Sequence, residues 1–151
     1  MEPLHVYDPD ELYRSVREGE YVTRDGKVAF SASAFSDRER KPSVDTSALR
    51  KDPREARRSA DQGVAKLIAG EMRTNCKVSI FNNKGKETGA HRVDVLHRPI
   101  ENDPDGEPDN LAHCQIECDP MIDNDRVFKR LKEALAGMAT QYGWVVKPGS
   151  P

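Results

Sequence analysis

The sequence predicts an α+β fold: a mixed or antiparallel sheet of about five to seven short strands, with one or two helices packed on one face. Short segments with alternating apolar and polar residues recur along the chain, which is the pattern of half-buried strands. One segment near the C-terminus has the three- and four-residue spacing of an amphipathic helix. The length of 151 residues fits one core, so we expect residues 1–151 to form a single domain with frayed ends at 1–10 and 147–151.

Composition predicts a small core and a heavily charged surface, because 36% of residues are hydrophobic and 33% are charged. No apolar run approaches the roughly 20 residues of a membrane span, and the N-terminus has neither a basic start nor an apolar signal core. We therefore expect a cytoplasmic protein with no membrane partner. The three cysteines, Cys76, Cys114 and Cys118, lack framework spacing, which predicts free, partly buried thiols.

The first 35 residues predict a small β-meander. Residues 12–16 and 20–24 have strand character and are separated by a turn at Gly19. The Asp25-Gly26 pair predicts a second turn, and the apolar segment VAFSASAF follows it.

The middle of the chain predicts a loop, a helix and one ambiguous segment. Residues 36–53 are polar and contain two prolines, which is typical of a loop. Asp52 as a cap and Pro53 as the first helical residue then predict a helix over PREARRSADQ, which stops at Gly63. Residues 64–70, VAKLIAG, fit a buried strand or a helix, and we favour the strand.

Residues 90–120 predict a β-hairpin with a long acidic loop, preceded by the strand KVSIFN. Alternation places one set of side chains of each arm on the apolar face: His91, Val93, Val95 and His97 in the first arm, and Ala112, Cys114, Ile116 and Cys118 in the second. The opposite face of the second arm then carries a polar row of His113, Gln115 and Glu117. The ten-residue loop ENDPDGEPDN is too long for a tight turn, and its prolines exclude a regular element.

The C-terminal part predicts the clearest helix of the chain, at 125–142. Its apolar residues recur at helical spacing, Asp123 or Asn124 can cap it, and Gly143 ends it. The segment WVVKP then predicts a short final strand that pairs with an edge of the sheet.

The formal net charge of −2 hides an uneven distribution. Residues 38–58 hold eight cations against four carboxylates, a net +4, and residues 98–125 hold one cation against nine carboxylates, a net −8. We expect these two oppositely charged regions either to face each other or to face a binding partner. The candidate binding residues are Asp103, Asp105 and Asp109 in the acidic region, and Arg50, Lys51, Arg54, Arg57 and Arg58 in the basic region.

The sequence predicts no metal site. Its histidines and cysteines, namely His91, His97, His113, Cys114 and Cys118, lack the close pairs of a zinc site. The acidic loop lacks the twelve-residue pattern and the terminal glutamate of a calcium loop. There is also no P-loop, dinucleotide-binding, hydrolase-elbow or zinc-protease motif, which removes the commonest nucleotide-binding and hydrolase assignments.

Three short motifs occur in a suggestive order: Arg14 on the first strand, Ser31 and Ser33 in the segment FSASAF, and Gln115 with Glu117 in QIE. This order resembles the Arg, Ser-x-Ser and Gln/Glu-x-Glu signature of the ADP-ribosyltransferase superfamily. The resemblance implies that NAD is the substrate, that Arg14 holds a phosphate or ribose, and that the two serines brace the nicotinamide pocket. Glu117 would stabilise the developing oxocarbenium ion.

The run LYRSV, FSASAFSDR, PSVD and DNLAHCQIE also resembles small bacterial proteins to which we attach no activity, whose genes often accompany toxin, defence or mobile-element operons. The resulting hypothesis is a protein-interaction module without a cofactor, an accessory component of a bacterial defence or toxin-type system that binds another protein through its charged regions. One alternative is an enzyme that acts on NAD. The other is a protein that binds the nucleic-acid backbone through residues 38–58.

Overall fold

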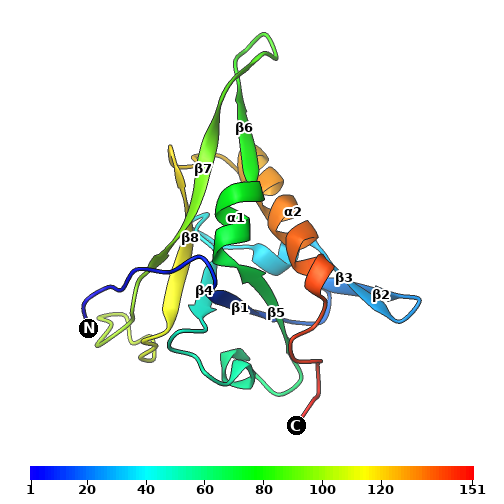
Figure 1. Ribbon diagram of the computed structural model, residues 1–151, viewed down its shortest axis with the longest axis vertical. Helices are drawn as coiled ribbons and strands as arrows, with labels where there is room; N and C mark the ends of the chain where they lie inside the picture. Colours follow the sequence, from blue (N-terminus) through cyan, green and yellow to red (C-terminus); the bar gives the residue numbers. More distant parts are fainter.

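The computed structural model describes residues 1–151 and confirms the α+β class (Figure 1). Six antiparallel strands form one sheet in the order β5-β1-β4-β8-β7-β6. Their bounds are β1 Glu11–Val16, β4 Ser43–Thr46, β5 Gly63–Ile68, β6 Lys77–Phe81, β7 Glu87–His97 and β8 His113–Asp119. A separate two-stranded sheet pairs β2, Tyr21–Arg24, with β3, Lys27–Phe30. The α-helices are α1, Ala69–Asn75, and α2, Asp125–Tyr142, and the short 3₁₀ helices are η1, Ala32–Phe35, and η2, Pro53–Ala56.

One main hydrophobic core lies between the large sheet and the two α-helices. Its 24 buried residues include Leu12, Val93 and Ile116 from the sheet, and Met72 and Leu131 from the helices. Because both helices contribute to the same cluster, they cover the same face of the sheet. The other face carries mostly polar side chains.

Helix α2 begins and ends where its sequence predicts. The side chain of Asn124 accepts a hydrogen bond from the backbone N–H of Val127 at 2.9 Å, which satisfies one of the free N–H groups of the first turn. Phe128, Leu131 and Leu135 are buried at helical spacing. Gly143 terminates the helix with a φ of 71°, a conformation that favours glycine.

The predicted hairpin of residues 90–120 is confirmed as the β7–β8 pair. Val93 lies opposite Cys118 and Val95 lies opposite Ile116, all on the core face. The acidic loop is closed at its base by an isolated bridge between Ile100 and Asn110. The predicted segregation of apolar and polar faces is therefore observed in both arms.

The predicted N-terminal meander is wrong in its pairing. Strand β1 does not pair with β2; it lies between β4 and β5 in the large sheet. Leu12 and Val16 are fully buried, and that burial requires a neighbouring strand on each side together with the helical layer. Only β2 and β3 form a local hairpin, through the Asp25-Gly26 turn.

The predicted loop of residues 36–53 contains the short central strand β4, which pairs with β1 and β8. Only Val44 and Thr46 point into the core from this strand, at 2% and 3% exposure. Two inward residues are too few to produce a periodic signal in the sequence. The strand forms because its neighbours supply the rest of the apolar face.

The predicted helix over residues 53–62 is reduced to η2. Asp52 caps this turn as expected, because its side chain accepts from the backbone N–H of Arg54 at 3.0 Å. None of the residues of η2 is buried, so no packing stabilises a longer helix. The ambiguous segment 64–70 is a strand up to Ile68, as favoured, and α1 then begins at Ala69, a helix that the sequence did not predict.

Both chain ends, expected to fray, are held against the fold. The backbone N–H of Leu4 donates to Nδ1 of the buried His97 at 2.8 Å, and Val6 is 3% exposed. At the other end, Arg57 donates to the carbonyl of Ser150 at 2.7 Å. The predicted final strand is an isolated bridge between Val146 and Val64 on the edge strand β5.

The β6–β7 hairpin extends beyond the body as an arm (Figure 1). Residues 82–90, which form its tip, are exposed. The turn is fixed by Asn82, whose side chain accepts from the backbone N–H groups of Lys84 and Lys86 at 2.9 and 3.0 Å. Gly85 has a φ of 76° at this turn.

Candidate functional site

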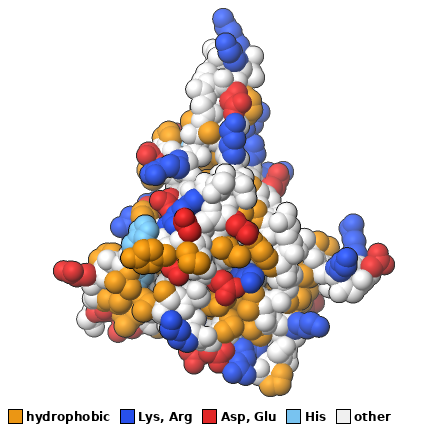
Figure 2. Space-filling model, viewed as in Figure 1, with side chains coloured by type: hydrophobic (Ala, Val, Ile, Leu, Met, Phe, Trp, Pro, Cys, Tyr) orange, Lys and Arg blue, Asp and Glu red, His pale blue; other side chains and the backbone are white.

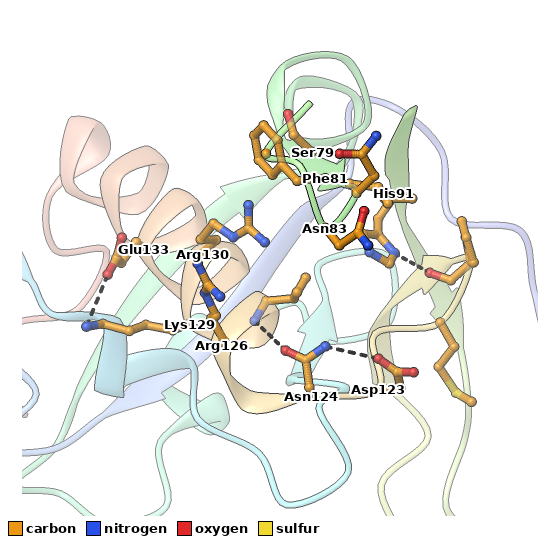
Figure 3. Close-up of a pocket in the computed structure, with 16 residues that line it drawn as sticks. Ser79, Phe81, Asn83, His91, Asp123, Asn124, Arg126, Lys129, Arg130 and Glu133 are labelled. Atoms are coloured by element: carbon orange, nitrogen blue, oxygen red, sulfur yellow. Dashed lines mark hydrogen bonds and ion pairs between the residues drawn. The ribbon is translucent and has the colours of Figure 1, made fainter. Parts of the chain in front are cut away.

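An open groove of about 1150 Å³ lies between the arm and the first half of α2 (Figure 3). The arm contributes Ser79, Phe81 and Asn83, and the loop after β8 closes one end. The opposite wall is formed by side chains of α2, namely Arg126, Lys129, Arg130 and Glu133. Elements that are about 40 residues apart in the chain thus face each other across the groove.

The helical wall follows from the amphipathic pattern of α2. Since Phe128, Leu131 and Leu135 face the core, the intervening Arg126, Lys129 and Arg130 are turned towards the groove. The hydrophobic stripe that docks the helix therefore also aligns its cations along one wall.

The arm wall is shaped by an irregularity in β6. The register between β6 and β7 shifts between Ile80 and Phe81. Phe81 is half exposed, and the guanidinium carbon of Arg130 lies 5.3 Å from the centre of its ring. Arg130 thus spans from the helix to the arm through a cation–π contact.

The cations of the groove have few acidic partners. Lys129 forms a loose pair with Glu133 at 3.9 Å, and neither Arg126 nor Arg130 forms an ion pair. The Nε atom of Arg130 is buried without any hydrogen-bond partner. The carboxylate of Asp123, which also lines the groove, accepts from the side chain of Asn124.

Counting charges over the arm and this part of α2 shows how positive the region is. Residues 77–92 and 126–133, here named the cationic face, hold eight cations against two carboxylates, a net +6 in a chain of net −2. Figure 2 shows lysine and arginine side chains at the apex of the arm and along it. The remaining residues therefore sum to −8.

The polar groups of the groove do not form a catalytic pair. The ring of His91 is bonded through Nδ1 to the carbonyl of Pro120 at 2.6 Å, and because a carbonyl only accepts, Nδ1 carries the proton. The hydroxyl of Ser79 donates to Glu87 at 2.6 Å rather than to a base. The arrangement suits binding of an anion more than bond cleavage.

The structure separates the residues of the transferase resemblance. Arg14 points to the core side of the sheet, where its guanidinium donates to the carbonyls of Ala34, Ser43 and Ser36, and burial lowers its pKa. Glu117 lies on the opposite face, in an ion pair with Arg98 at 2.9 Å. Arg14 and Glu117 therefore cannot converge on one NAD molecule.

The other transferase candidates serve local structure. The carbonyls of Ser31 and Ser33 accept from Ala34 and Ser36 around η1. Gln115 shares the outer face with Glu117, whereas η1 packs on the core face of the sheet through Ala34 and Phe35. No nicotinamide pocket is assembled from these residues.

The predicted polar row of β8 exists, and two of its three members are bonded within the sheet. His113 donates from Nδ1 to the carbonyl of Arg98 at 2.7 Å, so its Nε2 accepts from the hydroxyl of Ser43 at 3.0 Å. The hydrogen bond with Glu117 raises the pKa of Arg98. These bonds join β4, β8 and β7 across the outer face.

Three of the eight cations of residues 38–58, namely Arg40, Arg50 and Arg54, pair with carboxylates of the protein. Arg50 pairs with Asp45 at 3.1 Å and also donates to the side chain of Asn110. Arg54 pairs with Asp52 at 2.9 Å, and Arg57 donates to backbone carbonyls. Lys51 and Arg58 form no ion pair. Part of the positive charge of this segment is thus balanced by carboxylates of the protein, and the part carried by Lys51 and Arg58 is not.

The acidic loop is ordered by its own carboxylates. Asp103 accepts from the backbone N–H groups of Asp105 and Glu107 at 3.1 and 3.2 Å, and Asp109 accepts from that of Asn102 at 2.9 Å. The carboxylates of Asp105 and Glu107 form no hydrogen bond or ion pair. Of the three aspartates named from the sequence, only Asp105 presents its carboxylate freely.

The cations of the cationic face can be recognised in the sequence, although their charge distribution along the chain does not single them out. Arg126, Lys129 and Arg130 lie at i, i+3 and i+4 on the polar face of a predicted helix, and Lys84 and Lys86 flank a turn glycine. What the sequence does not give is their proximity. Only the packing of α2 beside β6 brings the two sets together.

No protein-family model, curated protein or solved structure matches the chain. The structure has no group of three or more histidine, cysteine or acidic side chains placed to hold a metal ion. Neither of its α-helices combines the length and apolarity that crossing a membrane requires. The chemistry of the groove is therefore the main guide to function.

Proposed function

We propose that the protein is a nucleic-acid-binding module whose contact surface is the cationic face. The observation that carries this proposal is the net charge of +6 over the two segments that flank the groove, residues 77–92 and 126–133, in a chain whose overall charge is negative. Neutralising phosphates releases condensed counterions, and this term supplies most of the affinity of non-specific nucleic-acid binding.

The shape of the region supports an extended ligand. The groove is open, and its volume of about 1150 Å³ is above the usual range of small-molecule pockets, roughly 300–1,000 Å³. The arm continues the positive charge beyond the groove, because Lys84 and Lys86 lie at its tip. Figure 2 shows Lys or Arg side chains at the apex of the arm. A polyanion can follow this line of cations, whereas a single small anion would use one end of it.

The arginines of the groove are more available to a phosphate than the paired arginines of residues 38–58. Arg50 and Arg54 already have carboxylate partners, so a phosphate would have to displace them. Arg126 and Arg130 have none. Binding through Arg126 and Arg130 therefore breaks no ion pair, whereas binding through Arg50 and Arg54 would break two.

The experiment that tests the proposal is fluorescence anisotropy with a labelled 20-nucleotide strand over a salt series. If about five phosphates are neutralised, the slope of log K against log salt is about −3.5 for a single strand, and affinity falls roughly 100-fold between 50 and 200 mM salt. The double variant Lys84→Glu, Lys86→Glu should weaken binding and flatten the slope, because it removes two cations and adds two carboxylates.

A matched control carries the same change of charge in the other region. Lys51→Glu with Arg58→Glu also alters the net charge by −4, at residues that form no ion pair. Equal weakening by both variants would point to a general charge effect and contradict the assignment to the cationic face. Greater weakening by the control would instead support binding through residues 38–58.

The protein-interaction hypothesis remains a second candidate, favoured by the free carboxylates of Asp105 and Glu107. The variant Asp105→Lys, Glu107→Lys reverses charge but leaves the hydrogen bonds of Asp103 and Asp109 that order the loop. If the acidic loop binds a protein, this variant should abolish a salt-sensitive complex captured from the host. Membership of a bacterial defence or toxin-type system stays a prediction of the sequence.

A further inference from the structure

The most unusual contact of the groove is the pair formed by Phe81 and Arg130. Phe81 is 50% exposed, although its side chain is large and apolar, and it lies beside the cations of α2. The guanidinium of Arg130 lies over its ring, at 5.3 Å from the centre. No carboxylate pairs with this guanidinium, and its Nε has no acceptor.

Neither residue is accounted for by the core. Phe81 is absent from the main hydrophobic cluster, and it stands on the arm, past the point where the sheet is covered. A half-exposed ring with a guanidinium over one face offers its exposed part as a flat apolar surface next to a positive charge. Such a platform fits the face of a nucleobase, whose phosphates would lie against the neighbouring cations.

We infer that Phe81, held by Arg130, is a stacking platform for an unpaired base, so that the ligand of the cationic face is a single strand. This inference rests on the proposed function and narrows it. In a duplex the faces of the bases are covered by their neighbours, and only the backbone and the groove edges are accessible. A single strand exposes its bases, and stacking on aromatic side chains adds affinity without requiring a particular sequence.

The surroundings of the platform suit this ligand. Figure 3 shows Asn83 and His91 on the arm side of the groove and Arg126 on the helix side. The amide of Asn83 is free to bond a base edge, as is Nε2 of His91, because the protein occupies only Nδ1 of that ring. Arg126 and Lys129 are placed to contact the phosphates that flank the stacked nucleotide.

The test compares three probes of equal length: a single strand, the same strand with abasic sites in place of its central nucleotides, and the duplex. The abasic strand keeps the phosphates and lacks the bases. We expect the intact strand to bind about 5-fold to 150-fold more tightly than the abasic strand, which is the range for one stacked base. The duplex should bind more weakly than the intact strand.

Two variants of Phe81 distinguish the effect of aromatic stacking from the effect of side-chain size. Phe81→Leu keeps an apolar side chain of similar size but removes the aromatic face, and it should abolish the difference between intact and abasic strands while leaving the salt slope unchanged. Phe81→Tyr keeps the face and should retain the difference. Circular dichroism of both variants checks that the arm and the body are folded.

The outcomes distinguish the inference from the proposed function. If intact and abasic strands bind equally, or if Phe81→Leu leaves their difference intact, the stacking platform is excluded while salt-dependent binding still supports the module. If the duplex binds as tightly as the single strand, the inference is likewise overturned. If no probe binds at low salt, the inference and the proposed function fail together.

Discussion

Arg14 provides the sharpest test of the fold, because the structure gives it a structural role in place of a catalytic one. Its Nε and Nη1 donate to the carbonyls of Ala34 and Ser43 at 2.9 and 2.8 Å, and Nη2 donates to that of Ser36 at 2.8 Å. The guanidinium also lies 5.9 Å from the centre of the Phe35 ring. One side chain thus joins β1 to η1 and to the central strand β4.

The expected cost of Arg14→Ala follows from these contacts. A hydrogen bond that involves a charged group contributes about 1.5–3 kcal/mol, and two of the three bonds are partly buried, which gives about 3–6 kcal/mol. The bond to Ser36 is exposed and adds little. Releasing the side chain recovers up to about 2 kcal/mol of conformational entropy. We therefore expect a loss of about 1–4 kcal/mol in the free energy of unfolding.

Urea unfolding followed by circular dichroism measures this loss. With a slope of about 2 kcal/mol per molar urea, the midpoint should fall by about 0.5–2 M. Arg14→Lys should lose most of this stability as well, because one ammonium cannot serve three carbonyls in the fork geometry of a guanidinium. The exposed Arg24 on β2 forms no ion pair, so Arg24→Ala is the matched control and should change stability by less than about 0.5 kcal/mol. A loss below about 1 kcal/mol for Arg14→Ala, or a fully stable Arg14→Lys, would refute this reasoning.

Three further predictions concern glycines, the cap of α2 and the thiols. Gly63→Ala should lower the free energy of unfolding by about 1–3 kcal/mol, because the new Cβ would lie 2.5 Å from the Trp144 ring. Gly137→Ala, on the exposed face of α2, should raise the free energy of unfolding by about 0.5–1 kcal/mol. Thermal denaturation should therefore show a lower melting temperature for the first variant and a higher one for the second. Asn124→Ala should cost about 0.5–2 kcal/mol by removing the cap, seen as a lower urea midpoint. Burial raises the pKa of the Cys114 thiol from 9.0 to about 12, so the native protein should react with a disulfide reagent at pH 8 far more slowly than the unfolded chain. Since the folded pKa is the higher one, the stability linked to this thiol is complete below pH 9 and is lost as the pH rises from about 9 towards 12, which urea midpoints at pH 8 and pH 10 would show.

The parts of the fold that could be predicted are those whose burial differs strongly between two faces. In the β7–β8 hairpin, Val93, Val95 and Ile116 are buried while their neighbours are polar, so alternation alone identified both strands and their faces. The same holds for α2. Strand β4 could not be found in this way, because Val44 and Thr46 are its only inward residues. Its formation depends on β1 and β8, which are distant in the sequence.

The candidate site was harder to predict, because the charge of a surface depends on which residues the fold brings together and not on their order in the sequence. Residues 38–58 look strongly basic, yet Asp45 and Asp52 pair with Arg50 and Arg54 within that segment. The cationic face is assembled from two segments that are separated by more than 30 residues, including the acidic loop. A stretch of sequence that spans both segments also contains the acidic loop, so its net charge does not reveal the cationic face.

The tip of the arm lies outside the hydrophobic core, so its role in binding can be tested with little effect on the stability of the fold. Residues 82–90 are exposed and contribute nothing to the hydrophobic core. The tip is held by the β6–β7 ladder and by the side chain of Asn82, which accepts from two backbone N–H groups of the turn. The side chains of Lys84 and Lys86 form no hydrogen bond or ion pair whose loss would weaken the fold, since the hydrogen bonds that join these residues to Asn82 are made by their backbones. A substitution at the tip therefore changes the electrostatic field of the arm with little effect on folding, which makes the tip lysines a direct test of what the cationic face binds.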